Sequence, residues 1–154
     1  MTNQRGRFEY LSWNVVLALL LTLCVARLWV MPLPSSYWTD EMATLFVVRQ
    51  GPADPSFAVA PQVPQSIYYA LASLSAHLFG SSEAALRLPS LLAMLAALYF
   101  IARVAARLMH GGAAWFVVFG CLTLRGINYQ AADARPYALG TCIAAAGVWF
   151  LIRW

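Results

Sequence analysis

The stretch that decides the fold is AALRLPSLLAMLAALYFIARVAARLM, which covers residues 84–109. It contains no acidic residue, and its three arginines lie toward its two ends. At a rise of about 1.5 Å per residue, a helix of this length exceeds the hydrocarbon core of a bilayer, which is about 30 Å thick. The stretch therefore predicts a membrane-spanning helix.

The composition of the whole chain favours the same class of protein. Hydrophobic residues make up 62% of the 154 residues, charged residues only 10%, and the mean hydropathy is +0.67. Soluble domains average roughly 25% charged residues, and disordered chains are polar and rich in charge. We therefore exclude both classes and expect an all-α integral membrane protein. The bilayer is then its main partner.

Three further apolar stretches predict more spans, so we expect about four within a single membrane region over residues 1–154. They are residues 13–31, 113–127 and 136–152. All ten basic residues are arginine, and the net charge is +4. In a membrane protein this charge is a signal of topology, and no nucleic-acid partner is expected. Arg5 and Arg7 before the first span favour a cytoplasmic N-terminus. We expect a multi-pass protein of the bacterial plasma membrane.

Residues 32–83 are predicted to form an outer loop with juxtamembrane helices, because they hold six of the eight prolines. A short helix is expected over 39–49, capped by Thr39. Residues 65–79 are short for a span and carry an apolar stripe, so we expect them to lie flat on the membrane. If they do, this loop and the polar segment 128–135 face the same side of the membrane. If they span it, the two segments face opposite sides.

The pair Asp40-Glu41 follows the first span directly. A carboxylate at the lip of a membrane cavity can act as a general base or help to bind a divalent metal. The alternative is a solvated helix start, where acids suit the positive end of the helix dipole. Arg87 is expected to extend toward the interface in the manner of a snorkelling side chain.

The second polar segment supplies the other candidates. Arg135 precedes a predicted helix N-terminus, which suits it to bind phosphate. The alternative is an interface anchor paired with Asp133. His77 and His110 lack metal-ligand spacing to any partner, so neither is expected to bind a metal.

Together these segments resemble the GT-C membrane glycosyltransferases, in particular the superfamily of protein O-mannosyltransferases and lipid A aminoarabinose transferases. The likeness rests on Tyr37-Trp38-Thr39-Asp40-Glu41 after the first span and on residues 65–71, 78–90 and 128–139. It covers essentially the whole chain. The family implies inverting transfer of a sugar from a polyprenyl-phosphate carrier to an acceptor on the outer face of the membrane.

The resemblance also implies roles for individual residues. Asp40 would take the proton of the acceptor hydroxyl, and Glu41 would support Asp40 or the acceptor. Arg135 would neutralise the departing phosphate. The remaining expected substrate-binding residues are Tyr129, Asp133 and Tyr137. No cofactor is certain, and a divalent metal stays open.

Two departures from the family leave other functions open. Members commonly carry His or Glu before a Pro-Pro-Leu sequence, whereas residues 61–67 here read PQVPQSI. About four spans, instead of a dozen or so, indicate the N-terminal part of such an enzyme, completed by further spans or a partner subunit. The alternatives are a catalytically inactive membrane fragment, a small interaction subunit, or a transporter subunit. The last would need paired intramembrane charges, for which only Arg27 and Arg125 are candidates.

Overall fold

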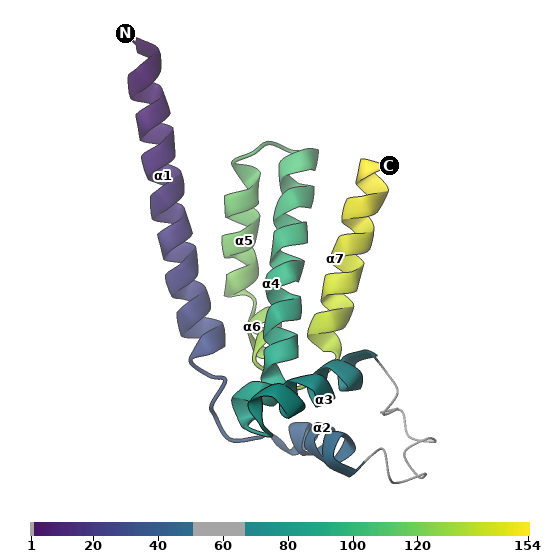
Figure 1. The fold of residues 1–154 in the computed structure, drawn as a ribbon. Coiled ribbons are helices and arrows are strands. Elements are labelled where there is room, and N and C mark those ends of the chain that lie inside the picture. Colours follow the sequence, from purple (N-terminus) through teal and green to yellow (C-terminus); the bar gives the residue numbers. More distant parts are fainter. Residues whose placement is uncertain (1, 51–66) are drawn as a thin grey trace.

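A computed structural model describes residues 2–50 and 67–154, with side chains from residue 13 onward. All regular elements in these residues are helices (Figure 1). The departure from the family at residues 61–67 lies outside the described residues, except for Ile67. The elements are α1 (Thr2–Val25) with a π-helical turn (Ala26–Val30), α2 (Thr39–Gln50), α3 (Ile67–Phe79), α4 (Glu83–Leu108), α5 (Ala113–Thr123), α6 (Arg125–Ala131) and α7 (Tyr137–Arg153).

The predicted second span is α4, and it is the central element of the bundle. It packs against α3, α5, α6 and α7. Its start follows from local sequence, because the Ser82 hydroxyl accepts a hydrogen bond from the backbone N–H of Ala85 and Glu83 lies in the first turn. In Figure 1, α4, α5 and α7 run side by side, while α2 and α3 cross one end of them.

Pro89 lies inside α4 and helps to join it to α3. A proline has no backbone N–H, so it leaves the carbonyl four residues earlier without its helical partner. That carbonyl belongs to Ala85, and the buried hydroxyl of Ser75 in α3 donates to it at 2.6 Å. The carbonyl that the proline leaves free thereby gains a hydrogen bond from a neighbouring helix.

By length and composition, two helices are long and apolar enough to cross a membrane. They are Trp13–Val30 and Glu83–Leu108. Three shorter apolar helices, α3, α5 and α7, accompany them. Most of the first stretch is exposed, and α1 stands away from α4 and α7 (Figure 1). A hydrogen bond of 3.1 Å from the Trp115 indole to Asn14 joins α1 to α5.

The stretch 113–127, predicted as one continuous span, is interrupted. Helix α5 ends at Thr123, Leu124 is extended, and α6 begins at Arg125. The side chain of Asn128 explains the break, because its Nδ2 donates to the carbonyl of Leu122 at 2.7 Å, and its Oδ1 accepts from the Trp29 indole at 2.8 Å. Asn128 therefore fixes the interrupted backbone against the end of the first long helix.

Candidate functional site

The centre of the candidate site is a buried ion pair between Glu41 on α2 and Arg87 on α4. Glu41 is fully buried and Arg87 is 1% exposed. The guanidinium Nε donates to Oε1 at 2.7 Å, and Nη2 donates to Oε2, so the pair is held at two points. The expectation that Arg87 snorkels to the interface was wrong. Its charge is neutralised inside the protein, because a burial of this depth requires a charged partner.

Arg87 also binds the irregular chain that follows the first long helix. Its Nη1 donates to the carbonyls of Leu33 at 2.8 Å and Ser35 at 2.7 Å, and Nη2 donates to that of Ser36 at 3.2 Å. Two prolines make this segment non-helical, so its carbonyls lack regular helical partners. One guanidinium thus fixes both α2 and the segment that leads into it.

Glu41 has two further backbone partners. Its Oε2 accepts from the N–H of Trp38 at 2.9 Å, which is the N3-to-N-cap bond of a capping box. Its Oε1 accepts from the N–H of Ala134 at 2.8 Å. Glu41, and not the predicted Thr39, supplies this bond at the start of α2. Burial by itself would raise the pKa of Glu41, but the hydrogen bonds from Arg87, Trp38 and Ala134 outweigh it and lower the pKa, so the carboxylate is ionised at neutral pH.

Asp40 forms a second, exposed ion pair on the same helix. Its Oδ2 accepts from Nη1 of Arg135 at 2.7 Å, across 95 positions of sequence. Asp40 is 64% exposed and Arg135 22%. The Arg135 guanidinium also lies 5.0 Å from the centre of the Tyr137 ring. The alternative in which Arg135 pairs with Asp133 was wrong, because Arg135 reaches across to Asp40.

The backbone of Arg135 is also held in place. Its carbonyl accepts from the hydroxyl of Ser90 at 3.1 Å, and Ser90 shares a second hydrogen bond of 3.1 Å with the hydroxyl of Tyr68. Ser90 and Tyr68 are buried and lie on α4 and α3. The second polar segment therefore lies against both helices, and its position does not depend on the surface ion pair alone.

Asp133 is buried, and its two carboxylate oxygens have no hydrogen-bond partner among the described residues. Burial first, and then the negative charge of Glu41, raise its pKa to about 6. Two carboxylates cannot hydrogen-bond to each other, but a protonated Asp133 becomes a donor toward Glu41. Asp133 therefore acts on the site through charge and proton binding and does not present itself to a substrate.

Exposed aromatic rings surround the Asp40–Arg135 pair. The rings of Trp38 and Tyr129 lie edge to face, with their centres 6.5 Å apart. Tyr129 and Tyr137 are about half exposed. Of the predicted site residues, the structure gathers Asp40, Arg135 and the two tyrosines at one surface. It places Glu41 and Asp133 beneath that surface.

Sequence reasoning missed the role of Arg87 and the positioning role of Ser90. A signal for Arg87 was present, because an arginine one turn into an apolar span is costly unless it is paired. Nothing in the sequence marks Ser90. Among the described residues, no group of three or more His, Cys, Asp or Glu side chains could hold a metal ion.

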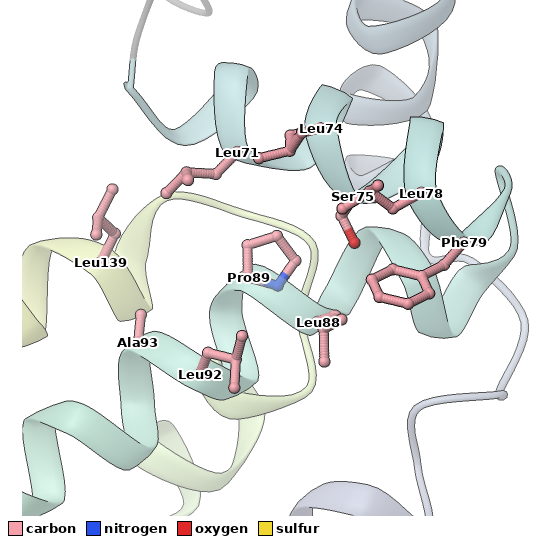
Figure 2. A pocket seen from close by; sticks show the side chains of 10 residues that line it. All are labelled: Leu71, Leu74, Ser75, Leu78, Phe79, Leu88, Pro89, Leu92, Ala93 and Leu139. Carbon is pink, nitrogen blue, oxygen red and sulfur yellow. The ribbon is translucent and has the colours of Figure 1, made fainter.

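An apolar groove of about 400 Å³ lies beside the site, between α3 and α4 (Figure 2). Leucines of α3 form one wall, Leu88, Pro89 and Leu92 of α4 form the other, and Leu139 of α7 lies at one end. Leu139 lies in the first turn of α7 and packs against the cluster that contains Ala134, so this end of the groove lies near the segment that carries Arg135. Its single hydroxyl, that of Ser75, is already bound to Ala85.

Comparisons with protein-family models, with curated proteins and with solved structures find no match to this chain.

Proposed function

We propose that this chain is a GT-C-type membrane glycosyltransferase, or its N-terminal part, which transfers a sugar from a polyprenyl-phosphate carrier to an acceptor on the outer face of the membrane. The observation that carries the proposal is the contact between Asp40 and Arg135. A carboxylate that can accept a proton and a cation that can bind phosphate lie side by side on one exposed surface. They come from the two segments that the family resemblance singles out.

The reaction assigns one step to each group. The acceptor hydroxyl gives its proton to Asp40 as its oxygen bonds to the anomeric carbon, and the bond from that carbon to the phosphate oxygen breaks. Arg135 stabilises the negative charge that develops on the leaving phosphate. An incoming phosphate competes with Asp40 for Arg135, and its binding releases the carboxylate to act as a base.

Glu41 keeps a supporting role in this proposal. Its four hydrogen bonds from Arg87, Trp38 and Ala134 leave it buried, so an acceptor does not reach it. It joins α2 to the segment that carries Arg135, which holds base and cation at their observed separation. Asp40 is therefore the single catalytic carboxylate of the proposal.

We place α1, α4, α5 and α7 across the membrane, with the N-terminus in the cytoplasm of a bacterial cell and α2 and α3 flat on the outer surface. The apolar stripe of α3 supports this placement, because it is exposed and three of its four members line the groove between α3 and α4. Its members are Ile67, Leu71, Leu74 and Leu78. The groove beside them suits the hydrocarbon tail of the carrier, whose phosphate would lie at Arg135.

A second candidate is a small interaction subunit without activity of its own. The observation that favours it is an apolar gap of about 340 Å³ between α1 and the pair α4 and α5. Side chains of another membrane helix would fill this gap. Purification from native membranes in a mild detergent, with one stoichiometric partner retained by the wild type and lost in Leu21→Trp, would support this candidate.

The test of the enzyme proposal separates donor binding from transfer. Membranes carrying the chain, with any further subunit supplied, receive a radiolabelled polyprenyl-phosphate sugar. Arg135→Gln should weaken donor binding about tenfold or more. Asp40→Asn should bind donor at least as well as the wild type, because it removes the internal competitor for Arg135. It should nevertheless lose on the order of 10²–10⁴ in transfer rate.

Arg49→Gln is the matched control, because Arg49 is an exposed arginine on α2 away from the pair. It should change neither binding nor transfer. Unchanged binding in Arg135→Gln would sink the proposed phosphate site. An unchanged transfer rate in Asp40→Asn would sink the proposed base.

A further inference from the structure

At the end of the bundle opposite the candidate site, three arginines lie on two helices that pack together. Arg103 and Arg107 are one turn apart in the last part of α4, and Arg153 ends α7. All three are exposed. Helices α4 and α7 run side by side to this end (Figure 1), so the arginines form one cationic surface.

Trp149 joins the two helices within this surface. The Arg103 guanidinium lies 5.1 Å from the centre of the Trp149 ring, and the ring is half-buried one turn before Arg153. A guanidinium over an indole face is held in position while its N–H groups stay available. The contact fixes one of the three cations against the neighbouring helix.

No acid neutralises this surface in the part of the chain whose side chains are described. The two ion pairs there are Glu41–Arg87 and Asp40–Arg135. The acids with described side chains all lie toward the other end, and Glu83 is roughly 30 Å from Arg103 along α4. Among the described side chains these three cations have no acidic partner, and an anion from outside the chain would neutralise them.

We propose that Arg103, Arg107, Arg153 and Trp149 form a binding site for the headgroup of an anionic phospholipid, in the leaflet that contains the α4 and α7 C-terminal ends. This rests on the membrane insertion proposed above and is independent of sugar transfer. The phosphate binds the guanidinium groups, and Trp149 lies at the depth of the headgroups, where indoles are enriched. The exposed apolar residues of both helices, among them Tyr99 and Phe150, contact the acyl chains.

A soluble phosphate offers the same chemistry, but the surface suits the lipid better. Its cations border helices whose exposed side chains are apolar, so a ligand with a charged head and an apolar tail contacts both regions. A free anion gains only the first contact. We therefore commit to the lipid and make displacement by phosphate an outcome of the test.

The experiment places the full chain in nanodiscs of phosphatidylcholine with about 20–30 mole per cent phosphatidylglycerol. The lipid that the chain retains is then identified by native mass spectrometry. The wild type should retain phosphatidylglycerol in preference to phosphatidylcholine. Removal of each arginine should weaken the preference roughly fivefold, so Arg103→Gln and Arg153→Gln should both show it. Arg125→Gln removes an exposed arginine of α6 and should leave the preference unchanged.

Each other outcome overturns the site. Equal retention of both lipids by a chain that enters the nanodiscs would refute it while leaving membrane insertion intact. A chain that does not enter nanodiscs would refute membrane insertion and the lipid site with it. If Arg125→Gln weakened the preference for phosphatidylglycerol as much as Arg103→Gln does, the cause would be general charge attraction. Displacement of phosphatidylglycerol by millimolar inorganic phosphate would assign the site to a free anion.

Discussion

Replacement of Glu41 by glutamine keeps the size of the side chain but removes the negative charge beside Arg87. The guanidinium then remains 99% buried without a counter-ion. The glutamine amide also turns its NH₂ group toward two donors, either Arg87 and Trp38 or Arg87 and Ala134, depending on its orientation. Because one partner of a buried ion pair is lost, we expect the free energy of unfolding to fall by about 3–5 kcal/mol.

The matched control is Asp40→Asn, which makes the same chemical change one residue earlier. Asp40 is 64% exposed, so loss of its pair with Arg135 should cost only about 0–1 kcal/mol. The free energy of unfolding is measured by denaturant titration in detergent micelles, with tryptophan fluorescence as the signal. Comparison of the two variants separates the stability cost of an unpaired buried charge from the cost of losing an acidic side chain.

A double-mutant cycle with Arg87→Met isolates the pair itself. Each single variant leaves one buried charge unpaired, whereas Glu41→Gln with Arg87→Met leaves none. The double variant should therefore lose clearly less stability than the sum of the two single losses. A cost below about 1 kcal/mol for Glu41→Gln would refute the buried-pair reasoning. Abolished sugar transfer at unchanged stability would instead return Glu41 to a catalytic role.

Three further predictions concern the pH dependence of stability, the hydrogen bond of Ser75 and the membrane topology. Because the pKa of Asp133 lies at about 6, above its usual 3.8, the free energy of unfolding falls as pH rises from about 4 to 6. Asp133→Asn should therefore raise the free energy of unfolding by about 1–3 kcal/mol at pH 7.5 and leave it unchanged near pH 4, as measured by unfolding at both pH values. Ser75→Ala leaves the carbonyl freed by a proline unsatisfied and should cost about 1–3 kcal/mol, with Ser75→Thr less harmful; equal unfolding midpoints for Ser75→Ala and wild type would contradict this. In a background without the native cysteines, Met42→Cys and Arg125→Cys should react with an impermeant maleimide from one side of the membrane, and Gly111→Cys from the other side. Labelling of Met42→Cys and Arg125→Cys from opposite sides would exclude a site shared by α2 and the segment 128–135.

The local sequence predicted most helix bounds closely. The expected helices at 39–49, 65–79, 84–109 and 136–152 correspond to α2, α3, α4 and α7 within two residues at each end. These bounds depend on prolines, caps and apolar runs, which act within a few residues of the chain. The apolar stripe of α3 was likewise visible as a periodic pattern. The face that α3 buries, with Tyr68 and Ser75, was not.

The break at Leu124 shows where local signals fail. Residues 113–127 are apolar enough for one helix, and no proline interrupts them. The helix ends because Asn128 binds the carbonyl of Leu122 and the indole of Trp29, which lies 99 positions away from Asn128. A pattern within the stretch itself does not contain that partner.

The sequence by itself determined that the chain is helical, where most of its helices begin and end, and that Asp40 and Arg135 are candidates for chemistry. Only the tertiary structure decided how neighbouring acids divide their roles. A step of one residue turns a side chain by about 100° around a helix, so Asp40 faces outward to Arg135 while Glu41 faces inward to Arg87. Helical sequence patterns repeat over three or four residues, whereas these two partners lie 46 and 95 positions away along the chain. Only the tertiary fold brings Arg87 and Arg135 within hydrogen-bond distance of α2.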